Sequence, residues 1–367
     1  MNERLRIGAR EVGPGCPTFT IAEIGVNHDG DVGLALHLVR AAAAAGADAI
    51  KLQLFRADRL VDASAGCCEY QNADSQMELL RRYELTTEEV GDVVDAARAA
   101  GLVPLATPFS VQDVAVCREL AFPAVKIASP DLVNRPLLRE AAKLGVPMLI
   151  STGASDEQEI VDTEAWLEGM AVPHVLLHCV SSYPTAMDEA RLDWIGRLAE
   201  ISVWPVGYSD HTTSPLAGAL AVAAGACVLE KHLTHDRDAE GPDHAASFEP
   251  HELNYYIHQV RVAERMTGVG PRRVLPCEAE VRRLSRQRLV YLRDLPPGHV
   301  LEWEDLATRR PAESGVLPVH AGTLVGRTLA RACPAGRPVA LTDLQPAAST
   351  STSTSTSESS STVAAAA

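Results

Sequence analysis

Two histidines occupy positions from which both could bind the same metal ion. His211 lies in the segment GYSDHT and His232 in EKHLT; each follows a short apolar run, with Asp210 or Glu230 close by. Two neutral imidazoles suit a catalytic divalent metal whose other positions are filled by water and substrate. Because two protein ligands are few, we expect Mn²⁺ or Mg²⁺ held with modest affinity rather than structural zinc. The alternative is that each histidine only makes hydrogen bonds.

Two lysines interrupt apolar runs earlier in the chain. Lys51 and Lys126 are costly to bury unpaired, so each must face an anion or a carboxylate. Hydroxyl side chains stand at the ends of neighbouring runs: Thr107, Ser129, Ser151, Thr152 and Ser209. Two ammonium groups ringed by hydroxyls predict a cradle for phosphate and carboxylate. The alternative is a pair of buried Lys–Glu contacts that only stabilise the fold.

Acidic side chains occur near the same run ends. They are Glu23, Asp131, Asp210, Glu230 and Asp243. Carboxylates placed there could move protons or hold sugar hydroxyls. Their spacing alone does not assign these roles.

The residues above share one position, the C-terminal end of an apolar run. Eight such runs lie at 21–30, 50–55, 103–109, 125–131, 147–153, 175–185, 206–212 and 228–234, with helical patterns between most of them. Strands whose polar residues gather at their C-terminal ends are typical of a (β/α)8 TIM barrel. An open doubly wound sheet is the alternative, but no G-x-G-x-x-G follows the first run. The sequence therefore predicts an α/β barrel enzyme.

Composition limits the partners of the chain. A net charge of −15 argues against nucleic acid, whose phosphates are bound by positive patches. An anionic substrate would then need a locally positive pocket. The first residues are polar and charged, and no apolar stretch approaches the ~20 residues that span a bilayer. We expect a cytoplasmic protein without membrane contacts.

The periodicity changes after a helical pattern around 251–266. From Arg288 onward, short runs separated by Pro-Gly and Ala-Gly turns predict a compact, mostly β domain. The final segment is rich in Ser, Thr and Ala and has too few large apolar residues to fold. The predicted division is a barrel at 1–275, a linker at 276–286, a small β domain at 287–346 and a disordered tail at 347–367.

Together these segments resemble the sialic acid synthase family. The matching motifs are IAEIGVNHDGD, IKLQLF, ATPF, VKIAS, ISTGA, LLHC…YPT, GYSDHT, EKH and GPDHAASFEP. The resemblance runs from Ile21 to about Leu344, and its C-terminal part is similar to the antifreeze-like (SAF) domain of that family. It implies condensation of phosphoenolpyruvate with an N-acetylmannosamine-type amino sugar to a sialic (nonulosonic) acid and phosphate, with cleavage of the donor's C–O bond.

The resemblance also implies residue roles. His211 and His232 match the metal ligands, and Glu23 matches an acid close to the reacting sugar. The residues that match the phosphoenolpyruvate contacts are Lys51, Thr107, Lys126, Ser129, Ser151 and Ser209. Those that match the sugar contacts are Gln53, Tyr183 and Asp243. Arg310 matches a SAF-domain arginine that reaches the sugar of the other subunit, which implies a domain-swapped homodimer.

Three positions depart from the family pattern. Asp131 replaces the usual Glu after the fourth strand and is one methylene shorter. Ser181 stands where members often carry Asn or Thr, two residues before the tyrosine. The SAF turn RPGxG reads RPAESG at 310–315, so the arginine's presentation could differ.

Two questions stay open at this point. Either Asp131 or Glu23 could handle the water that attacks the donor. A Schiff base on Lys126 or Lys51 would instead make the chain a pyruvate lyase or aldolase in a TIM barrel. A role limited to binding polysaccharide would leave the polar strand ends without a purpose.

Overall fold

The computed structural model describes residues 3–62, 75–268, 270–310 and 314–346. The predicted disordered tail at 347–367 and the SAF-turn residues 311–313 lie outside the described residues. The chain divides into two compact units, and the division falls between Gly270 and Pro271.

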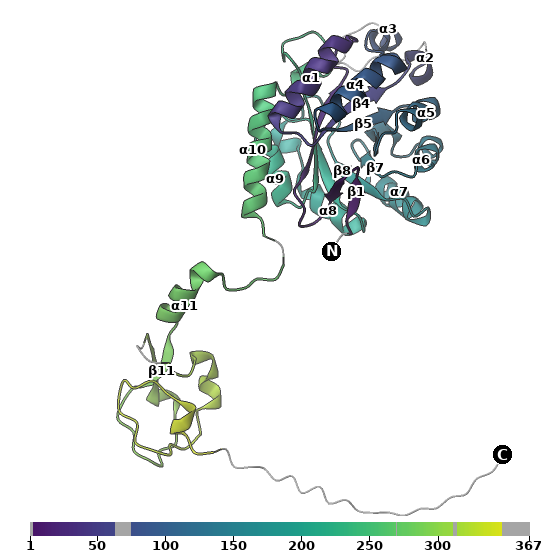
Figure 1. Ribbon diagram of the computed structural model, residues 1–367. Helices are drawn as coiled ribbons and strands as arrows, with labels where there is room; N and C mark the ends of the chain where they lie inside the picture. The colour runs from purple at the N-terminus through teal and green to yellow at the C-terminus, as the bar shows by residue number, and fades with distance from the viewer. Residues whose placement is uncertain (1–2, 63–74, 269, 311–313, 347–367) are drawn as a thin grey trace, which may run out of the picture. The chain divides into compact units, whose positions relative to one another are not determined.

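The first unit is a closed barrel of eight parallel strands (Figure 1). The strands are β3 (Phe19–Gly25), β4 (Ala49–Leu54), β5 (Val103–Pro108), β6 (Val125–Ile127), β7 (Met148–Ser151), β8 (His174–His178), β9 (Val206–Asp210) and β10 (Val228–His232). Strand β10 pairs with β3 to close the ring. Each strand falls within or overlaps one of the eight predicted apolar runs, and the TIM-barrel prediction is confirmed.

Helices cover the outside of this barrel (Figure 1). They are α1 (Val32–Ala45), α4 (Thr87–Ala99), α5 (Val111–Glu119), α6 (Arg135–Ala142), α7 (Glu157–Gly169), α8 (Asp193–Ile201), α9 (Ala217–Ala223) and α10 (Pro250–Met266), with α2 (Ala57–Leu60) and α3 (Gln76–Arg81) after β4. Local sequence sets their ends. For example, α1 begins at the capping side chain of Asp31 and ends at Gly46, whose φ of 87° favours glycine.

Apolar side chains fill one end of the barrel interior. Phe19, Leu105, Leu149 and Val228 pack together there with residues of an N-terminal hairpin, β1 (Leu5–Ile7) and β2 (Arg10–Val12). The sequence analysis did not predict this hairpin. Because apolar residues fill the end at which the strands begin, the polar residues of the strands are left at the opposite, C-terminal end.

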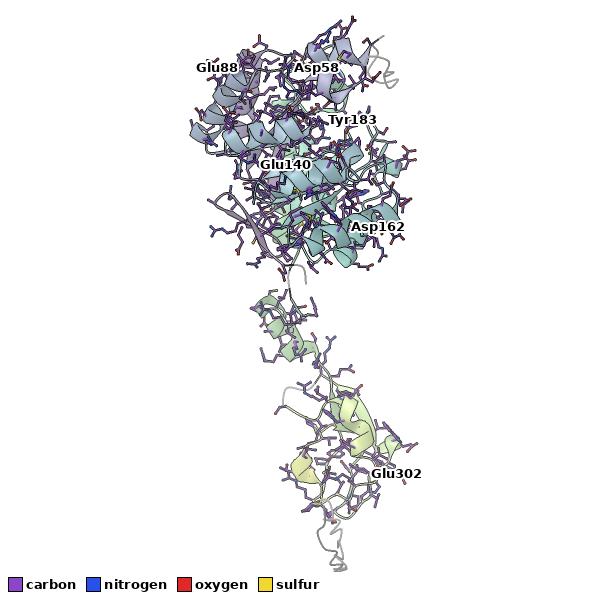
Figure 2. The ribbon with its side chains drawn as sticks, turned by 90° about the vertical axis from the view of Figure 1, so that its right-hand side faces the viewer. Asp58, Glu88, Glu140, Asp162, Tyr183 and Glu302 are labelled. Atoms are coloured by element: carbon purple, nitrogen blue, oxygen red, sulfur yellow. The ribbon has the colours of Figure 1, made fainter. Side chains whose placement is uncertain are left out.

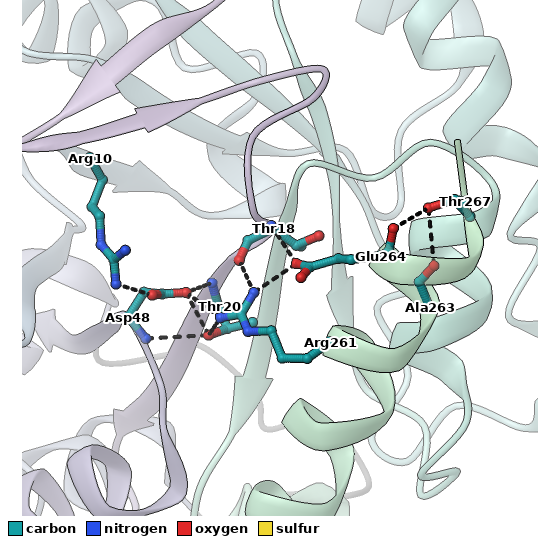
Figure 3. A network of polar contacts seen from close by, with 8 residues as sticks. All are labelled: Arg10, Thr18, Thr20, Asp48, Arg261, Ala263, Glu264 and Thr267. Carbon is teal, nitrogen blue, oxygen red and sulfur yellow. Dashed lines mark hydrogen bonds and ion pairs between the residues drawn. The ribbon is translucent and has the colours of Figure 1, made fainter. Parts of the chain in front are cut away.

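An ion-pair network ties α10 to the starting ends of the strands (Figure 3). Asp48, just before β4, accepts hydrogen bonds from the backbone NH and hydroxyl of Thr20, both at 2.9 Å. The same carboxylate pairs with Arg10 of the hairpin and, at 2.8 Å, with Arg261 of α10. Arg261 also pairs with Glu264 at 2.7 Å. These contacts fix the last barrel helix without reaching the C-terminal strand ends.

The second unit contains few regular elements (Figure 2, in which Glu302 is labelled). Helix α11 (Ala279–Ser285) lies within the predicted linker, and β11 (Arg288–Tyr291) pairs antiparallel with β12 (Leu306–Arg309). Most other pairings are isolated bridges, because turns interrupt each apolar run after a few residues. The core includes Leu289, Tyr291, Leu301, Leu324, Leu329 and Val339.

Short 3₁₀ helices complete both units. They are η2 (Ser129–Asp131), η3 (Met187–Glu189), η4 (His244–Ala246), η5 (Pro276–Glu278), η6 (Trp303–Asp305), η7 (Pro318–Thr323) and η8 (Leu341–Asp343). Across the described ranges, no helix is both long enough and apolar enough to cross a membrane.

Candidate active site

A cavity of about 540 Å³ opens at the C-terminal ends of the barrel strands. All but two of the predicted site residues line it. They are Lys51, Gln53, Thr107, Lys126, Ser129, Asp131, Ser151, Ser181, Tyr183, Ser209, His211, His232 and Asp243. The two exceptions are Glu23, which is completely buried against Lys51, and Arg310, which follows β12 in the second unit and is exposed.

The alternation of side chains along a strand decides which residues reach the cavity. Ser209 and His211 line it from β9 and its end, and Glu230 and His232 line it from β10. Asp210 alternates with them and is fully buried outside the cavity, near Lys231. Asp210 does lie at the C-terminal end of its strand, as expected, but its side chain does not line the cavity, because adjacent residues of a strand point to opposite faces.

The two lysines differ in their partners. Lys51 forms an ion pair with Glu23, donates a hydrogen bond to the hydroxyl of Thr107 at 2.8 Å and lies 3.8 Å from Glu230. Burial lowers the pKa of Lys51, but the two carboxylates outweigh burial and the net shift is upward. Lys51 thus fits the prediction of a buried Lys–Glu pair and also lines the cavity.

Lys126 carries the less compensated charge. Its ammonium donates to the carbonyl of Ile127 at 2.9 Å, and no carboxylate of the described residues lies within 4.0 Å of it. Burial lowers the pKa of Lys126, and the largest opposing influence is the charge of Glu230, which lies beyond ion-pair distance. A buried cation without a close counter-ion is suited to receive an anionic ligand.

The two imidazoles lie next to each other in the cavity, one edge toward the other's face. The rings of His211 and His232 have centroids 5.5 Å apart, and the ring of Tyr183, labelled in Figure 2, lies 4.2 Å from that of His211. The Nδ1 of His211 is 2.7 Å from the carbonyl of Val180, so Nδ1 carries the hydrogen and Nε2, which lies 3.5 Å from the Ser209 hydroxyl, carries the lone pair.

The protonation of these rings also fits a metal. Burial lowers the pKa of His211 to about 4, and burial together with the neighbouring His211 lowers the pKa of His232 well below its usual value. Both rings are therefore neutral near pH 7. Within the part of the chain that the structure describes, no group of three or more His, Cys, Asp or Glu forms a metal-binding set. The pair fits a divalent ion completed by water and substrate rather than a closed structural site.

Three acids line the cavity in different environments. Burial, then the charge of Glu23, raises the pKa of Asp243 to about 7. Burial also raises the pKa of Asp131, which ends η2 and accepts a hydrogen bond from Asn134 at 2.8 Å. Glu230 accepts from the Ser209 hydroxyl at 2.9 Å; burial raises its pKa, but Lys51 and Lys126 more than offset burial and the net shift is downward.

Glu230 was considered among the acids but not predicted as a site residue. Its position two residues before His232 on one strand places both side chains on the same face, and this spacing could have predicted that Glu230 lines the site.

The mouth of the cavity has an apolar side that the sequence analysis did not predict. It is formed by Val26, Phe55, Leu60, Val61, Leu80 and Phe109. The rings of Phe55 and Phe109 meet edge to face at 6.1 Å. These residues follow β3, β4 and β5, whereas the imidazoles come from β9 and β10.

Hydrogen bonds from Asn27 stabilise the segment that carries Asp243. The amide of this buried residue donates to the carbonyl of Leu233 at 3.0 Å and to the hydroxyl of Ser247 at 2.8 Å. Ser247 in turn donates to the carbonyl of Asp243 at 2.6 Å. Asn27 therefore fixes both ends of the loop that presents Asp243.

Comparison with known families gives two matches. The NeuB family profile matches residues 38–272, and the SAF domain profile matches residues 286–345. The NeuB match ends two residues past the division between the structural units, and the SAF match lies wholly within the second unit.

Individual relatives cover most of the chain. An N,N'-diacetyllegionaminic acid synthase of Legionella pneumophila is 38% identical over 90% of this chain and 95% of its own length. The N-acetylneuraminate-9-phosphate synthase of Homo sapiens is 31% identical over 87% of this chain and 90% of its own. A crystal structure of an N-acetylneuraminic acid synthetase from Leptospira borgpetersenii superposes with a TM-score of 0.71 at 33% identity, covering 77% of this chain and 95% of that one.

Proposed function

The chain belongs to the NeuB family, which includes sialic acid synthases, and on this premise we propose that it condenses phosphoenolpyruvate with an N-acetylmannosamine-type amino sugar. The products are a nonulosonic acid and phosphate. The observation that carries the proposal is the joint presence, in one cavity, of a buried lysine without a close counter-ion, several hydroxyls and two neutral imidazoles.

The floor of the cavity suits the donor. Lys126 offers its charge to the phosphate or carboxylate, and hydroxyls of Ser129, Ser151 and Ser209 surround the same space. Lys51 is already paired with Glu23, so it adds less net charge. Holding the donor in a fixed orientation supplies much of the rate of a bimolecular reaction.

The imidazole pair suits the acceptor's aldehyde. His211 and His232 would hold a divalent ion, which when bound polarises the aldehyde oxygen and stabilises its developing negative charge. Carbon 3 of the donor then attacks the aldehyde carbon, and the resulting cationic carbon 2 is captured by water. The adduct loses phosphate by breaking its C–O bond, which leaves a ketone at carbon 2.

We assign the water to Asp131 rather than to Glu23. Asp131 lines the cavity, while Glu23 is buried in the pair with Lys51. Burial raises the pKa of both carboxyls, so the position of Asp131 in the cavity, rather than its pKa, separates it from Glu23; a raised pKa suits either one to accept a proton from water.

The rest of the acceptor would contact Gln53, Tyr183 and Asp243, with Ser181 beside them. The apolar side of the mouth supports an uncharged acceptor over a sugar 6-phosphate, since a phosphate there would lose water without gaining a cation. Arg310 would complete the site from the partner in a domain-swapped homodimer, as in the family pattern.

One assay separates these possibilities. Full-chain protein is stripped with EDTA and given phosphoenolpyruvate with N-acetylmannosamine, its 6-phosphate or a 6-deoxy diacetamido hexose, with and without Mn²⁺ or Mg²⁺. We expect phosphate release that requires both metal and sugar, with either uncharged sugar preferred to the 6-phosphate. Absence of release with all three sugars would contradict the proposed reaction, whereas preference for the 6-phosphate would contradict only the choice of acceptor.

A second candidate is a Schiff-base pyruvate lyase. The observation that favours it is the lowered pKa of Lys126, because a neutral amine is the nucleophile in such enzymes. Covalent trapping of pyruvate on Lys126 by borohydride, together with activity that survives EDTA, would favour this reaction over the condensation.

A further inference from the structure

Lys231 is a buried cation that the proposed mechanism does not use. It precedes His232 on β10, points to the opposite face of the strand and is 1% exposed. Its ammonium donates to the carbonyl of Asp210 at 3.2 Å and to the carbonyl of Thr212. These two carbonyls flank His211, so one side chain holds the backbone on both sides of that histidine.

The same lysine also contacts the structure around His232. Its ammonium lies 4.1 Å above the ring of Phe248, and the backbone NH of Phe248 donates to the carbonyl of His232 at 2.9 Å. The Asp210 carboxylate, 3.7 Å from the ammonium, accepts from the backbone NH of Thr212 at 2.8 Å. Lys231 therefore joins the end of β9 to the end of β10.

We propose that Lys231 is a positioning residue that fixes the spacing of His211 and His232 through its hydrogen bonds to the backbone carbonyls on both sides of His211. This inference rests on the proposed function, in which the two imidazoles hold a divalent ion. Two ligands from different strands bind one ion tightly only if their separation is set in advance, and groups behind metal ligands commonly provide that order.

A purely stabilising role predicts something different. Replacing a buried ion pair by neutral or apolar groups of similar size is often neutral or even stabilising, because the charges no longer have to be taken out of water. If Lys231 only stabilises the fold, its replacement changes stability and leaves metal binding alone. If it positions the histidines, metal affinity falls whatever happens to stability.

The test compares the natural protein with the Lys231→Met/Asp210→Asn double variant. Each full chain is titrated with MnCl₂ alone, and calorimetry measures the binding of Mn²⁺. The double change removes both charges, so no unpaired buried ion remains. We expect Mn²⁺ affinity to fall about 10- to 100-fold, the range seen when groups behind metal ligands are lost. Phosphoenolpyruvate affinity measured without metal should stay unchanged, because Lys126 is untouched.

A matched control comes from another buried pair of the barrel. Glu164 of α7 lies 2.6 Å from His174 at the start of β8, far along the chain from both imidazoles. Glu164→Gln should lower the melting temperature and leave Mn²⁺ affinity unchanged. Equal Mn²⁺ affinity in the natural protein and the double variant overturns the proposal.

If the double variant does not fold, Lys231→Arg gives the answer. A planar guanidinium keeps the charge but cannot span the two carbonyls in the same way, so Mn²⁺ affinity should still fall. A folded Lys231→Arg protein with unchanged affinity overturns the inference. If the natural protein itself binds Mn²⁺ no better than His232→Ala, the metal site of the proposed function is what fails.

Discussion

At the reacting centre, two lysines with the same chemistry stand in opposite electrostatic situations. Lys51 forms ion pairs with Glu23 and Glu230. The ammonium of Lys126 instead donates a hydrogen bond to a backbone carbonyl and forms no ion pair with the described residues. The residue types and their strand positions were predictable from the sequence. The pairing was not, because it depends on the register that places Glu23 of β3 beside Lys51 of β4.

Replacing Lys126 should weaken the donor selectively. A charge-assisted contact to phosphate or carboxylate contributes roughly 1.5–3 kcal/mol, so Lys126→Ala should raise the KM for phosphoenolpyruvate about ten- to a hundredfold. Steady-state kinetics with each substrate varied in turn measures this. Lys143→Ala, which removes an exposed surface lysine, is the control. A rise confined to the KM for the sugar would contradict the donor-site assignment.

Asp131 should govern turnover rather than binding. Removing a general base typically costs about 10²- to 10⁴-fold, so Asp131→Asn should lower kcat within that range. Asp131→Glu restores the carboxylate, and with it the residue usual in the family, and should recover most of the rate. If Glu23→Gln lost kcat and Asp131→Asn did not, the assignment of the water would have to be reversed.

At the scale of elements, the strands were predictable because their polar residues end the apolar runs. The period-two alternation also excludes Asp210 from the cavity, although Ser209 and His211 on either side of it line the cavity. The sequence did not predict the hairpin β1–β2, because its strands are three residues each and most of the apolar residues they pack against lie far along the chain. The apolar side of the mouth likewise depends on loops brought together only by closure of the barrel.

The loop after β10 gives a test at this scale. Asn27 holds the loop at Leu233 and Ser247, so Asn27→Ala leaves buried groups unpaired and should lower the free energy of unfolding by about 1–3 kcal/mol. Because Asp243 sits on the loop, the KM for the sugar should rise more than that for phosphoenolpyruvate. Denaturant unfolding and steady-state kinetics give the two readouts.

Asn254→Ala is the matched control for that change. Its amide donates to the carbonyl of Ala45 at 3.4 Å, between α10 and α1, and Asn254 is not among the residues that line the cavity. It should change stability slightly and leave both KM values as they are. Equal effects of the two variants on the KM for the sugar would mean that Asn27 does not position Asp243.

At the scale of the whole molecule, the order of the two units was predictable from the change in periodicity. The predicted boundaries at 275 and 286 remain predictions, and the structure adds a helix, α11, where a linker was expected. Whether Arg310 contacts the active site of its own chain or that of a partner subunit depends on the assembly, which the sequence of one chain does not specify.

A mixing experiment tests the domain-swapped dimer. His232→Ala and Arg310→Ala should each be inactive alone. After subunits of the two variants exchange in equal amounts, about a quarter of all sites should combine an intact barrel with an intact arginine, given random two-fold dimers. No returning activity after verified exchange would contradict the swapped arrangement. Full activity of Arg310→Ala alone would remove the arginine from the site.

The central claim is that carbon–oxygen cleavage of phosphoenolpyruvate accompanies formation of the new carbon–carbon bond. The most direct measurement uses phosphoenolpyruvate labelled with oxygen-18 at the atom that bridges carbon and phosphorus. Incubated with the full chain, Mn²⁺ and the preferred sugar, it should give phosphate that carries the label, as read by mass spectrometry, and an unlabelled sugar acid. Unlabelled phosphate, or a product formed from pyruvate without release of phosphate, would contradict the account.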